Sequence, residues 1–217
     1  MKKMKTNSLK LNNFSLAFGD NVLFKNLDYE FLPGIYIFSG PSGVGKSSLM
    51  RCIAGLNTDY SGSIILNDEI MTGTTPKIHM VHQHYTSFPW LDIVANTLMV
   101  FKGHKVKVTK DTKKYAKEVL IQLGLEEHLK KKPHQLSGGQ NQRVSIASAL
   151  INNMSPVILY DEMTSALDEK NSYRVVNLIK EHQRQNQNIV IVITHEAHVA
   201  KALGGTRVEF TENWRIR

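Results

Sequence analysis

The 217-residue sequence contains a single cysteine, Cys52, and no apolar run that approaches the roughly 20 residues of a membrane-spanning helix. One cysteine excludes an internal disulfide and is typical of a reducing compartment, where a buried structural thiol is its expected role. The basic N-terminus lacks the apolar segment of a secretory signal peptide. These absences predict a cytoplasmic protein that meets a membrane only through a partner.

Acidic residues are too few to balance the basic ones. The sequence has 27 Lys and Arg against 19 Asp and Glu, a net charge of +8, which favours anionic partners such as a nucleotide, a nucleic acid or an acidic membrane surface. The lysines gather at Lys2, Lys3 and Lys5, across residues 102–117, and at residues 130–132. Such runs are more often solvated faces than binding sites, and no basic and aromatic platform accompanies them. We therefore expect no nucleic-acid partner.

One short glycine-rich stretch organises the chain. It fits the pattern G-x-x-x-x-G-K-[ST] of a phosphate-binding loop, and it lies between a β-prone apolar segment at 35–38 and a segment with Leu49, Ile53 and Leu56 at helical spacing. The residues of the loop and the serine after it are Gly40, Pro41, Ser42, Gly43, Val44, Gly45, Lys46, Ser47 and Ser48.

The chemistry of a phosphate loop follows from these residue types. Glycines let backbone N–H groups point inward around phosphate oxygens, and the N-terminus of the following helix adds partial positive charge. Lys46 is expected to reach the β- and γ-phosphates, and the Ser47 hydroxyl to hold Mg²⁺. The alternative is a glycine turn with a solvated lysine.

The rest of the pattern is α/β. Residues 9–32 read as antiparallel strands with tight turns, whereas residues 35–38, 157–160 and 189–193 are short, wholly apolar runs, as found in parallel strands covered on both faces. No strand signal appears between about residues 85 and 156, where helices are expected at 92–101, at 111–123 and again after residue 140. The sequence thus predicts a mainly parallel sheet, an N-terminal antiparallel β-subdomain and an inserted helical subdomain.

Polar side chains follow two of the buried strands. Asp161 and Glu162 come after one, and His195 follows another. Because ligands of such sheets bind at the carboxyl ends of the strands, Asp161 is a candidate Mg²⁺ ligand, Glu162 a candidate base for the attacking water, and His195 a candidate contact for the γ-phosphate. A helix cap and an ordinary loop histidine are the structural alternatives.

The segment Leu136-Ser137-Gly138-Gly139-Gln140 resembles the signature motif of ATP-binding cassette (ABC) proteins, and the phosphate loop and Asp161-Glu162 flank it in the family's order. The resemblance covers nearly the whole chain. It implies further roles: Gln83 resembles the glutamine that contacts Mg²⁺ and the attacking water, His195 the switch histidine, and Phe18 the aromatic residue that stacks on adenine. Residues 165–168, ending in Asp168, resemble the D-loop.

The resemblance implies a fold and a mechanism. The fold is a P-loop NTPase core of the RecA-like type at residues 1–84 and 156–217, with the helical subdomain at 85–155. Two copies would bind two ATP molecules head to tail, each phosphate lying between the loop of one copy and Ser137, Gly138, Gly139 and Gln140 of the other. ATP binding closes such a dimer and hydrolysis reopens it.

The chain departs from the family pattern at three positions. Met163 stands where proline usually follows the glutamate, Ser148 where an arginine is common, and His82 where an aromatic residue is common. None of these bears phosphate chemistry directly. Met163 affects the turn toward the D-loop, so it bears on the rate of hydrolysis more than on ATP binding.

Several classes of ABC protein compete. About 90 residues without sustained heptads separate loop and signature, unlike the long coiled coils of DNA-repair members.

The aromatic stretch from Gln83 to Leu91, with Phe88 and Trp90, is typical of the groove that receives a helix of a transmembrane permease subunit. Packing inside the helical subdomain is its alternative. Residues 88–91 with Asn96 resemble importer subunits of the nitrate, sulfonate and taurine group. We therefore expect an ATPase, peripheral on the inner face of the cell membrane, that powers an importer; a soluble ABC ATPase acting in complex assembly or on nucleic acid is the alternative.

Overall fold

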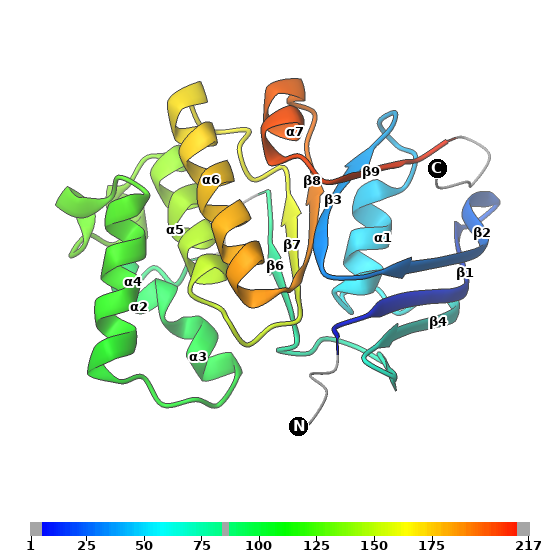
Figure 1. The fold of residues 1–217 in the computed structure, drawn as a ribbon, viewed down its shortest axis with the longest axis horizontal. Helices are drawn as coiled ribbons and strands as arrows, with labels where there is room; N and C mark the ends of the chain where they lie inside the picture. Colours follow the sequence, from blue (N-terminus) through cyan, green and yellow to red (C-terminus); the bar gives the residue numbers. More distant parts are fainter. Residues whose placement is uncertain (1–5, 84–86, 212–217) are drawn as a thin grey trace.

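A four-stranded antiparallel sheet forms one side of the molecule, at the right of Figure 1. The computed structural model describes residues 6–83 and 87–211, so the basic cluster at Lys2, Lys3 and Lys5 and residues 84–86 of the aromatic stretch lie outside the described part. The strand order in this sheet is β2-β1-β4-β5. The strands are β1 (Leu9–Phe18), β2 (Asn21–Phe31), β4 (Ser61–Leu66) and β5 (Glu69–Ile70).

A five-stranded parallel sheet forms the centre. Its order is β6-β7-β8-β3-β9, and every adjacent pair is parallel. The register sets Ile193 opposite both Phe38 and Asp161, so three strands end at the same level. This edge carries the glycine loop and the polar residues that follow the strands. The strands are β3 (Gly34–Ser39), β6 (Ile78–Val81), β7 (Val157–Asp161), β8 (Ile189–Ile193) and β9 (Thr206–Glu209).

Helices cover both faces of the parallel sheet. Figure 1 shows α1 between the two sheets, while α5 and α6 lie on the opposite face and α2 to α4 form an outer group beside α5. The helices are α1 (Lys46–Ile53), α2 (Ile93–Thr97), α3 (Met99–Gly103), α4 (Lys110–Gln122), α5 (Gly138–Leu150), α6 (Glu169–Asn186) and α7 (Ala197–Leu203), with short 3-10 turns η1 (Glu126–His128) and η2 (Pro133–Gln135).

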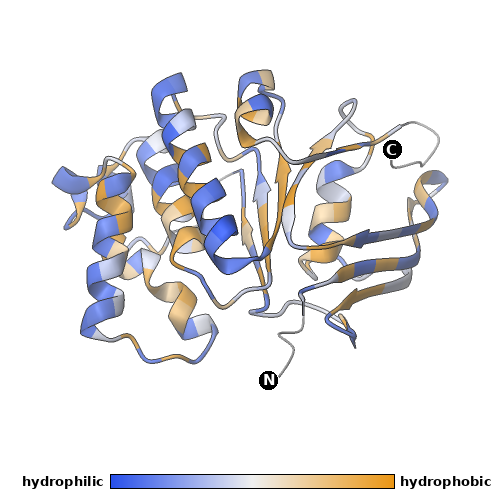
Figure 2. Cartoon of the chain, in the orientation of Figure 1, coloured by the Kyte–Doolittle hydropathy of each residue, from blue (hydrophilic) through white to orange (hydrophobic). Residues whose placement is uncertain are grey.

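Apolar burial on both faces of the sheet explains this arrangement. All residues of β7 and β8 are buried, and the strand colours in Figure 2 show the same apolar runs. One buried cluster joins the antiparallel sheet and α1 to one face, and the other joins α2 to α7 to the opposite face. Alternate residues of a parallel strand point to opposite faces, which requires runs that are apolar throughout. The predicted α/β class is confirmed.

Some local predictions differ from the structure. Residues 92–101 form two short helices joined at Leu98 rather than one. Leu56 does not share the buried face of α1: the helix ends at Ile53, and Leu56 is 52% exposed. Strand β9, which pairs with β3, was not expected. Cys52 is buried, and burial raises the pKa of its thiol to about 11, as expected of a structural cysteine. In the described ranges, no helix is long and apolar enough to cross a membrane.

Candidate nucleotide-binding site

The glycine loop between β3 and α1 has a backbone that few residues other than glycine adopt. Gly40 has φ of 131° and Gly45 has φ of 101°. A Cβ on Gly40 would lie 2.5 Å from the carbonyl oxygen of Phe210, and one on Gly45 would lie 2.9 Å from the ring of Phe24. Both the conformation and the close approach require glycine here. The loop is thus packed tightly against the Phe210 backbone and the buried Phe24 ring.

Lys46 is the first residue of α1 and is 6% exposed. Its Nζ donates hydrogen bonds to the carbonyl oxygens of Gly40 at 2.8 Å and Pro41 at 2.7 Å. Burial lowers the pKa of this ammonium, and the charge of Glu162 partly opposes that shift. The ammonium is therefore desolvated and bound to neutral carbonyls, and a phosphate would give it a stronger, charged partner.

Asp161 ends strand β7 as a buried carboxylate. Its Oδ1 accepts a 3.4 Å hydrogen bond from the Ser47 hydroxyl. Burial raises the pKa of this carboxyl, the neighbouring charge of Glu162 raises it further, and the Ser47 hydrogen bond works in the opposite direction. A cation beside Asp161 would relieve both the burial cost and the repulsion.

Glu162 is held by residues from two other strand ends. Gln83, after β6, donates a 2.8 Å hydrogen bond from Nε2 to Glu162 Oε2, and His195 Nε2, after β8, lies 3.3 Å from Oε1. The backbone N–H of Glu162 donates to the Ile193 carbonyl at 3.0 Å, with φ of 49° at Glu162. The parallel register therefore gathers three polar side chains that lie far apart in the sequence.

A hollow of about 220 Å³ joins the loop to Glu162 and His195 but is not lined by Gln83. Its lining includes loop residues, Glu162 and His195, and none of the described signature residues. The lining residues are Ser42, Gly43, Gly45, Lys46, Ser47, Ser48, Glu162, Ile193 and His195.

Phe18 lies near the other end of the loop. It ends β1, opposite Asn21 in the sheet register, and is 52% exposed. Asn21 lines a second hollow of about 290 Å³ together with Pro41, Gly43 and other loop residues, Ser42 and Val44 among them. Phe18 is thus paired with a residue that lines a hollow beside the loop, and its side chain is half exposed instead of buried in the core of the sheet.

The signature residues begin α5, on the other side of the parallel sheet from α1 (Figure 1). Ser137 caps the helix: the Gln140 N–H donates to Ser137 Oγ at 3.3 Å, and the Ser137 N–H donates to Gln140 Oε1 at 2.9 Å. Ser137 and Gly138 are exposed. This helix end presents free N–H groups to solvent, which suits an anion.

The D-loop lies against the signature. A Cβ on Gly139 would lie 2.6 Å from the Ala166 carbonyl oxygen, so the two segments touch through backbone. Asp168 caps α6 by accepting hydrogen bonds from Asn171, and Arg143 donates to Asn171 Oδ1 at 2.9 Å. The structure therefore brings Asp168 to the signature and not into the hollow at the glycine loop.

No sequence pattern marks the residues that pack against the glycine loop. Phe24 and Phe210 read as ordinary strand residues, yet the Phe24 ring packs against Gly45, the Phe210 backbone packs against Gly40, and the two rings lie 5.8 Å apart, centroid to centroid. Their role depends on which strands pair, since Phe210 N–H donates to the Ser39 carbonyl at the end of β3.

An α/β sheet with this loop at a strand end, a lysine in it and a buried aspartate beside it defines a P-loop nucleotide-binding protein. Residues 24–165 match the family model described as ABC transporter. The chain is 35% identical over 96% of its length, and 72% of the relative's, to the aliphatic sulfonates import ATP-binding protein SsuB of Albidiferax ferrireducens. It is 33% identical over 96% of its length, and 88% of the relative's, to the probable ABC transporter ATP-binding protein PEB1C of Campylobacter jejuni.

Solved structures agree with this family. The dimeric post-hydrolysis state of the ATP-binding cassette MJ0796 bound to ADP and Pi matches with a TM-score of 0.81 and 29% identity, covering 96% of this chain and 97% of that one. The chain belongs to the ABC transporter family. It is an ATP-binding cassette and an ATPase.

Proposed function

We propose that two copies of this chain bind two ATP molecules head to tail and that closure of this dimer powers an importer. The observation that carries the proposal is the separation within one copy: the hollow at the glycine loop contains Lys46 and Glu162 but no signature residue. The exposed start of α5, with Ser137 and Gly138, is then free to bind the γ-phosphate held by the other copy. The dimeric cassette structures support this assembly.

In this proposal Phe18 stacks on the adenine, and the glycine loop with Lys46 holds the phosphates. Glu162 accepts a proton from the attacking water on a carboxylate oxygen, while Gln83 and His195 orient that carboxylate and contact water and γ-phosphate. Asp168 orders the D-loop beside the signature. The 2.8 Å and 3.3 Å contacts to Glu162 support these roles, because a base must be oriented toward its substrate.

Mg²⁺ fits the residues beside the loop. Ser47, Asp161 and Gln83 offer the oxygen ligands that Mg²⁺ prefers, and a cation would offset the burial of Asp161. Among residues 6–83 and 87–211, no cluster of three His, Cys, Asp or Glu side chains forms a metal cage, which suits an ion that keeps several waters and phosphate oxygens. Such an ion neutralises phosphate charge when bound.

The permease is proposed to dock near Leu91, the described end of the aromatic stretch. Phe88 and Trp90 are 39% and 66% exposed, with ring centroids 5.5 Å apart. Asn96 is buried and braces this loop: its Oδ1 accepts from Phe88 N–H at 2.7 Å, and its Nδ2 donates to the carbonyls of Phe88 and Leu91 at 3.1 Å each. A rigid exposed aromatic pair is typical of a docking surface.

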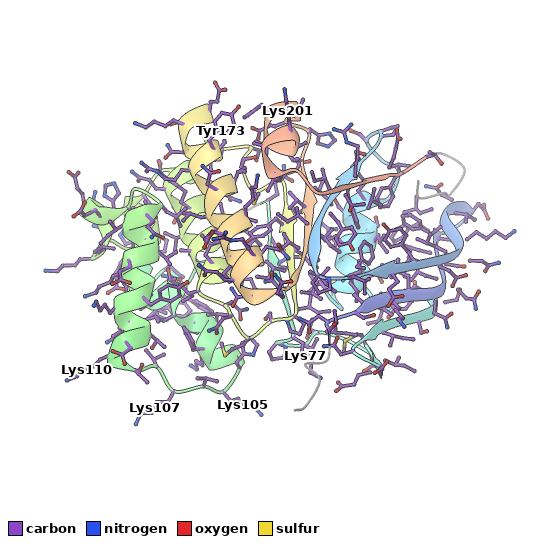
Figure 3. All side chains as sticks on the ribbon, in the orientation of Figure 1. Lys77, Lys105, Lys107, Lys110, Tyr173 and Lys201 are labelled. Atoms are coloured by element: carbon purple, nitrogen blue, oxygen red, sulfur yellow. The ribbon has the colours of Figure 1, made fainter. Side chains whose placement is uncertain are left out.

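A groove of about 740 Å³ continues from Leu91 and is mainly apolar at its base, with Leu98 and Val106 among its lining. Five lysines also line it: Lys102, Lys105, Lys107, Lys110 and Lys113. Figure 3 shows Lys105 and Lys107 projecting from the loop between α3 and α4, and Lys110 from the start of α4. The charge of this rim favours a permease helix with acidic residues beside its apolar face.

We further propose that residues 85–155 move as one helical subdomain against a core of residues 1–84 and 156–217, on the inner face of the cell membrane. Gln83 precedes the first of these helices and contacts Glu162, so the orientation of the subdomain and the catalytic carboxylate are linked by one hydrogen bond.

The proposed head-to-tail dimer, in which two ATP molecules are sandwiched between two copies of the chain, is tested with Glu162→Gln. This variant is expected to retain nucleotide but to hydrolyse it slowly. ATP should convert this variant from monomer to dimer in sedimentation velocity, and ADP should not. Adding Ser137→Arg, which obstructs the start of α5, should restore the monomer. A Glu162→Gln chain that stays monomeric at saturating ATP contradicts the head-to-tail sandwich.

Docking is tested by affinity purification from detergent-solubilised membranes of the native organism. The wild type should retain a protein with several membrane spans, and Trp90→Asp should lose it while Lys201→Asp, on the exposed face of α7, should keep it. Retention of a soluble assembly protein or of nucleic acid in place of a membrane protein supports the alternative functions.

A further inference from the structure

Gln140, the last residue of the signature, makes a contact outside its own helix. Its Nε2 lies 2.9 Å from Nε2 of His128, at the end of the turn η1, in a partly buried position. The same carboxamide accepts the Ser137 N–H on Oε1 at 2.9 Å. One side chain thus joins the cap of α5 to a histidine twelve residues earlier in the chain.

The hydrogen-bond roles follow from the cap. Because Oε1 already accepts from Ser137, the carboxamide presents its NH₂ group to the imidazole, and His128 Nε2 must be the acceptor. The opposite orientation of the amide would set the NH₂ of Gln140 against the Ser137 N–H, with two donors facing each other. The ring proton of His128 then resides on Nδ1, which is buried and has no hydrogen-bond partner among the described residues. The lone pair on His128 Nε2 therefore accepts the hydrogen bond from Gln140.

The turn that carries His128 is itself fixed. The His128 N–H donates to the carbonyl of Leu125, a fully buried residue, at 3.0 Å, and the His128 carbonyl accepts from Lys131 N–H at 2.8 Å. The Lys131 carbonyl in turn accepts from Ile93 N–H at 3.0 Å, at the start of α2. A side chain on such a backbone can hold a partner in one position.

We propose that His128 is a positioning residue for the signature: its imidazole Nε2 holds the Gln140 carboxamide in the orientation that caps Ser137, and so fixes the N–H groups that meet the second ATP. The proposal rests on the proposed sandwich for its effect on ATP-driven closure. Its effect on the cap is a property of a single copy. No contact between His128 and nucleotide is involved.

The test compares two variants in the Glu162→Gln background. His128→Leu removes the acceptor and keeps the bulk, whereas His128→Gln offers Oε1 near the place of the imidazole Nε2. His128→Leu should raise the dissociation constant of the ATP-bound dimer roughly 10- to 30-fold, because a hydrogen bond of ordinary strength is lost in each of two copies. His128→Gln should stay within about threefold of the parent, and so should His134→Leu, a control on the exposed part of the next turn. ATP affinity of the monomer should not change.

A measurement on the monomer without nucleotide separates this proposal from the sandwich. Amide exchange resolved by NMR should show the Gln140 N–H exchanging about fivefold faster in His128→Leu than in the wild type, with His128→Gln close to the wild type. Unchanged exchange in His128→Leu overturns the proposal, and so does a His128→Gln as defective as His128→Leu. If Glu162→Gln does not dimerise with ATP, the sandwich fails while the exchange data still decide the role of His128.

Discussion

The Gln83 carboxamide donates a 2.8 Å hydrogen bond to Glu162, and His195 lies 3.3 Å from the other oxygen of the same carboxylate. The ends of strands β6, β7 and β8 thus meet at one side chain. Each carboxylate oxygen can accept two hydrogen bonds, so both oxygens of Glu162 keep a free lone pair for a water molecule. The two contacts therefore orient the carboxylate.

Glu162→Gln is expected to lower the rate of ATP hydrolysis by about 10²- to 10⁴-fold, because an amide cannot accept the proton of the attacking water. ATP affinity should stay within about threefold of the wild type. Phosphate release measured at saturating ATP checks this, with Glu118→Gln on the exposed face of α4 as the matched control. A hydrolysis rate that falls less than about tenfold assigns the base to another group.

Lys46→Ala is expected to weaken ATP binding by more than about tenfold, since a charge-assisted hydrogen bond to phosphate in a desolvated site is lost. The wild-type ammonium already lies at the loop, bound to the carbonyls of Gly40 and Pro41. Titration calorimetry of the variant, beside Lys201→Ala as a control for charge, measures the difference. Equal affinity in Lys46→Ala and the wild type contradicts the role given to this lysine.

Gly139→Ala and Gly138→Ala form a matched pair in the first turn of α5. The new methyl at 139 meets the Ala166 carbonyl at 2.6 Å, whereas a methyl at 138 meets nothing within 4 Å. Gly139→Ala should therefore lower the free energy of unfolding by about 1–3 kcal/mol as the D-loop is pushed away. Gly138→Ala should be neutral or slightly stabilising. Urea unfolding followed by circular dichroism distinguishes them, and equal values for the two variants contradict the close packing of signature and D-loop.

Stability should fall in mild acid. Burial lowers the pKa of His79 and of His182 from 6.5 to about 4. Each unfolded imidazole therefore binds a proton that the folded one excludes between about pH 6.5 and pH 4, so the free energy of unfolding decreases as pH falls through this range. For His182, which is 6% exposed, the loss is on the order of 2–3 kcal/mol.

The contribution of His182 is measured by urea unfolding of wild type and His182→Gln at several values between pH 8 and pH 5. The variant should be less stable at pH 8 and show a shallower dependence on pH, while His134→Gln, at an exposed histidine, should follow the wild type. Parallel pH curves for wild type and His182→Gln rule out His182 as a source of the acid sensitivity.

Much of the fold could be predicted because the signals are local. Each pattern is contained within one short segment of the chain. Examples are the apolar runs of β7 and β8, the glycine loop before Lys46 and the helical pattern of α5. Leu56 shows the limit of such reasoning. Its spacing from Ile53 fits a helix, but α1 ends at Ile53, so Leu56 is left outside the buried face.

The amino-acid sequence alone determined the chemistry of the phosphate loop, because glycines at positions 40 and 45 permit the positive φ found there and Lys46 follows them. It also determined that the chain carries a signature and a carboxylate pair. Only the tertiary structure decided that Gln83, Glu162 and His195 meet, since this depends on the parallel register of strands separated by whole helices. The same packing keeps α5 on the opposite face of the sheet from α1, so the hollow at the phosphate loop is lined by none of the described signature residues of its own chain.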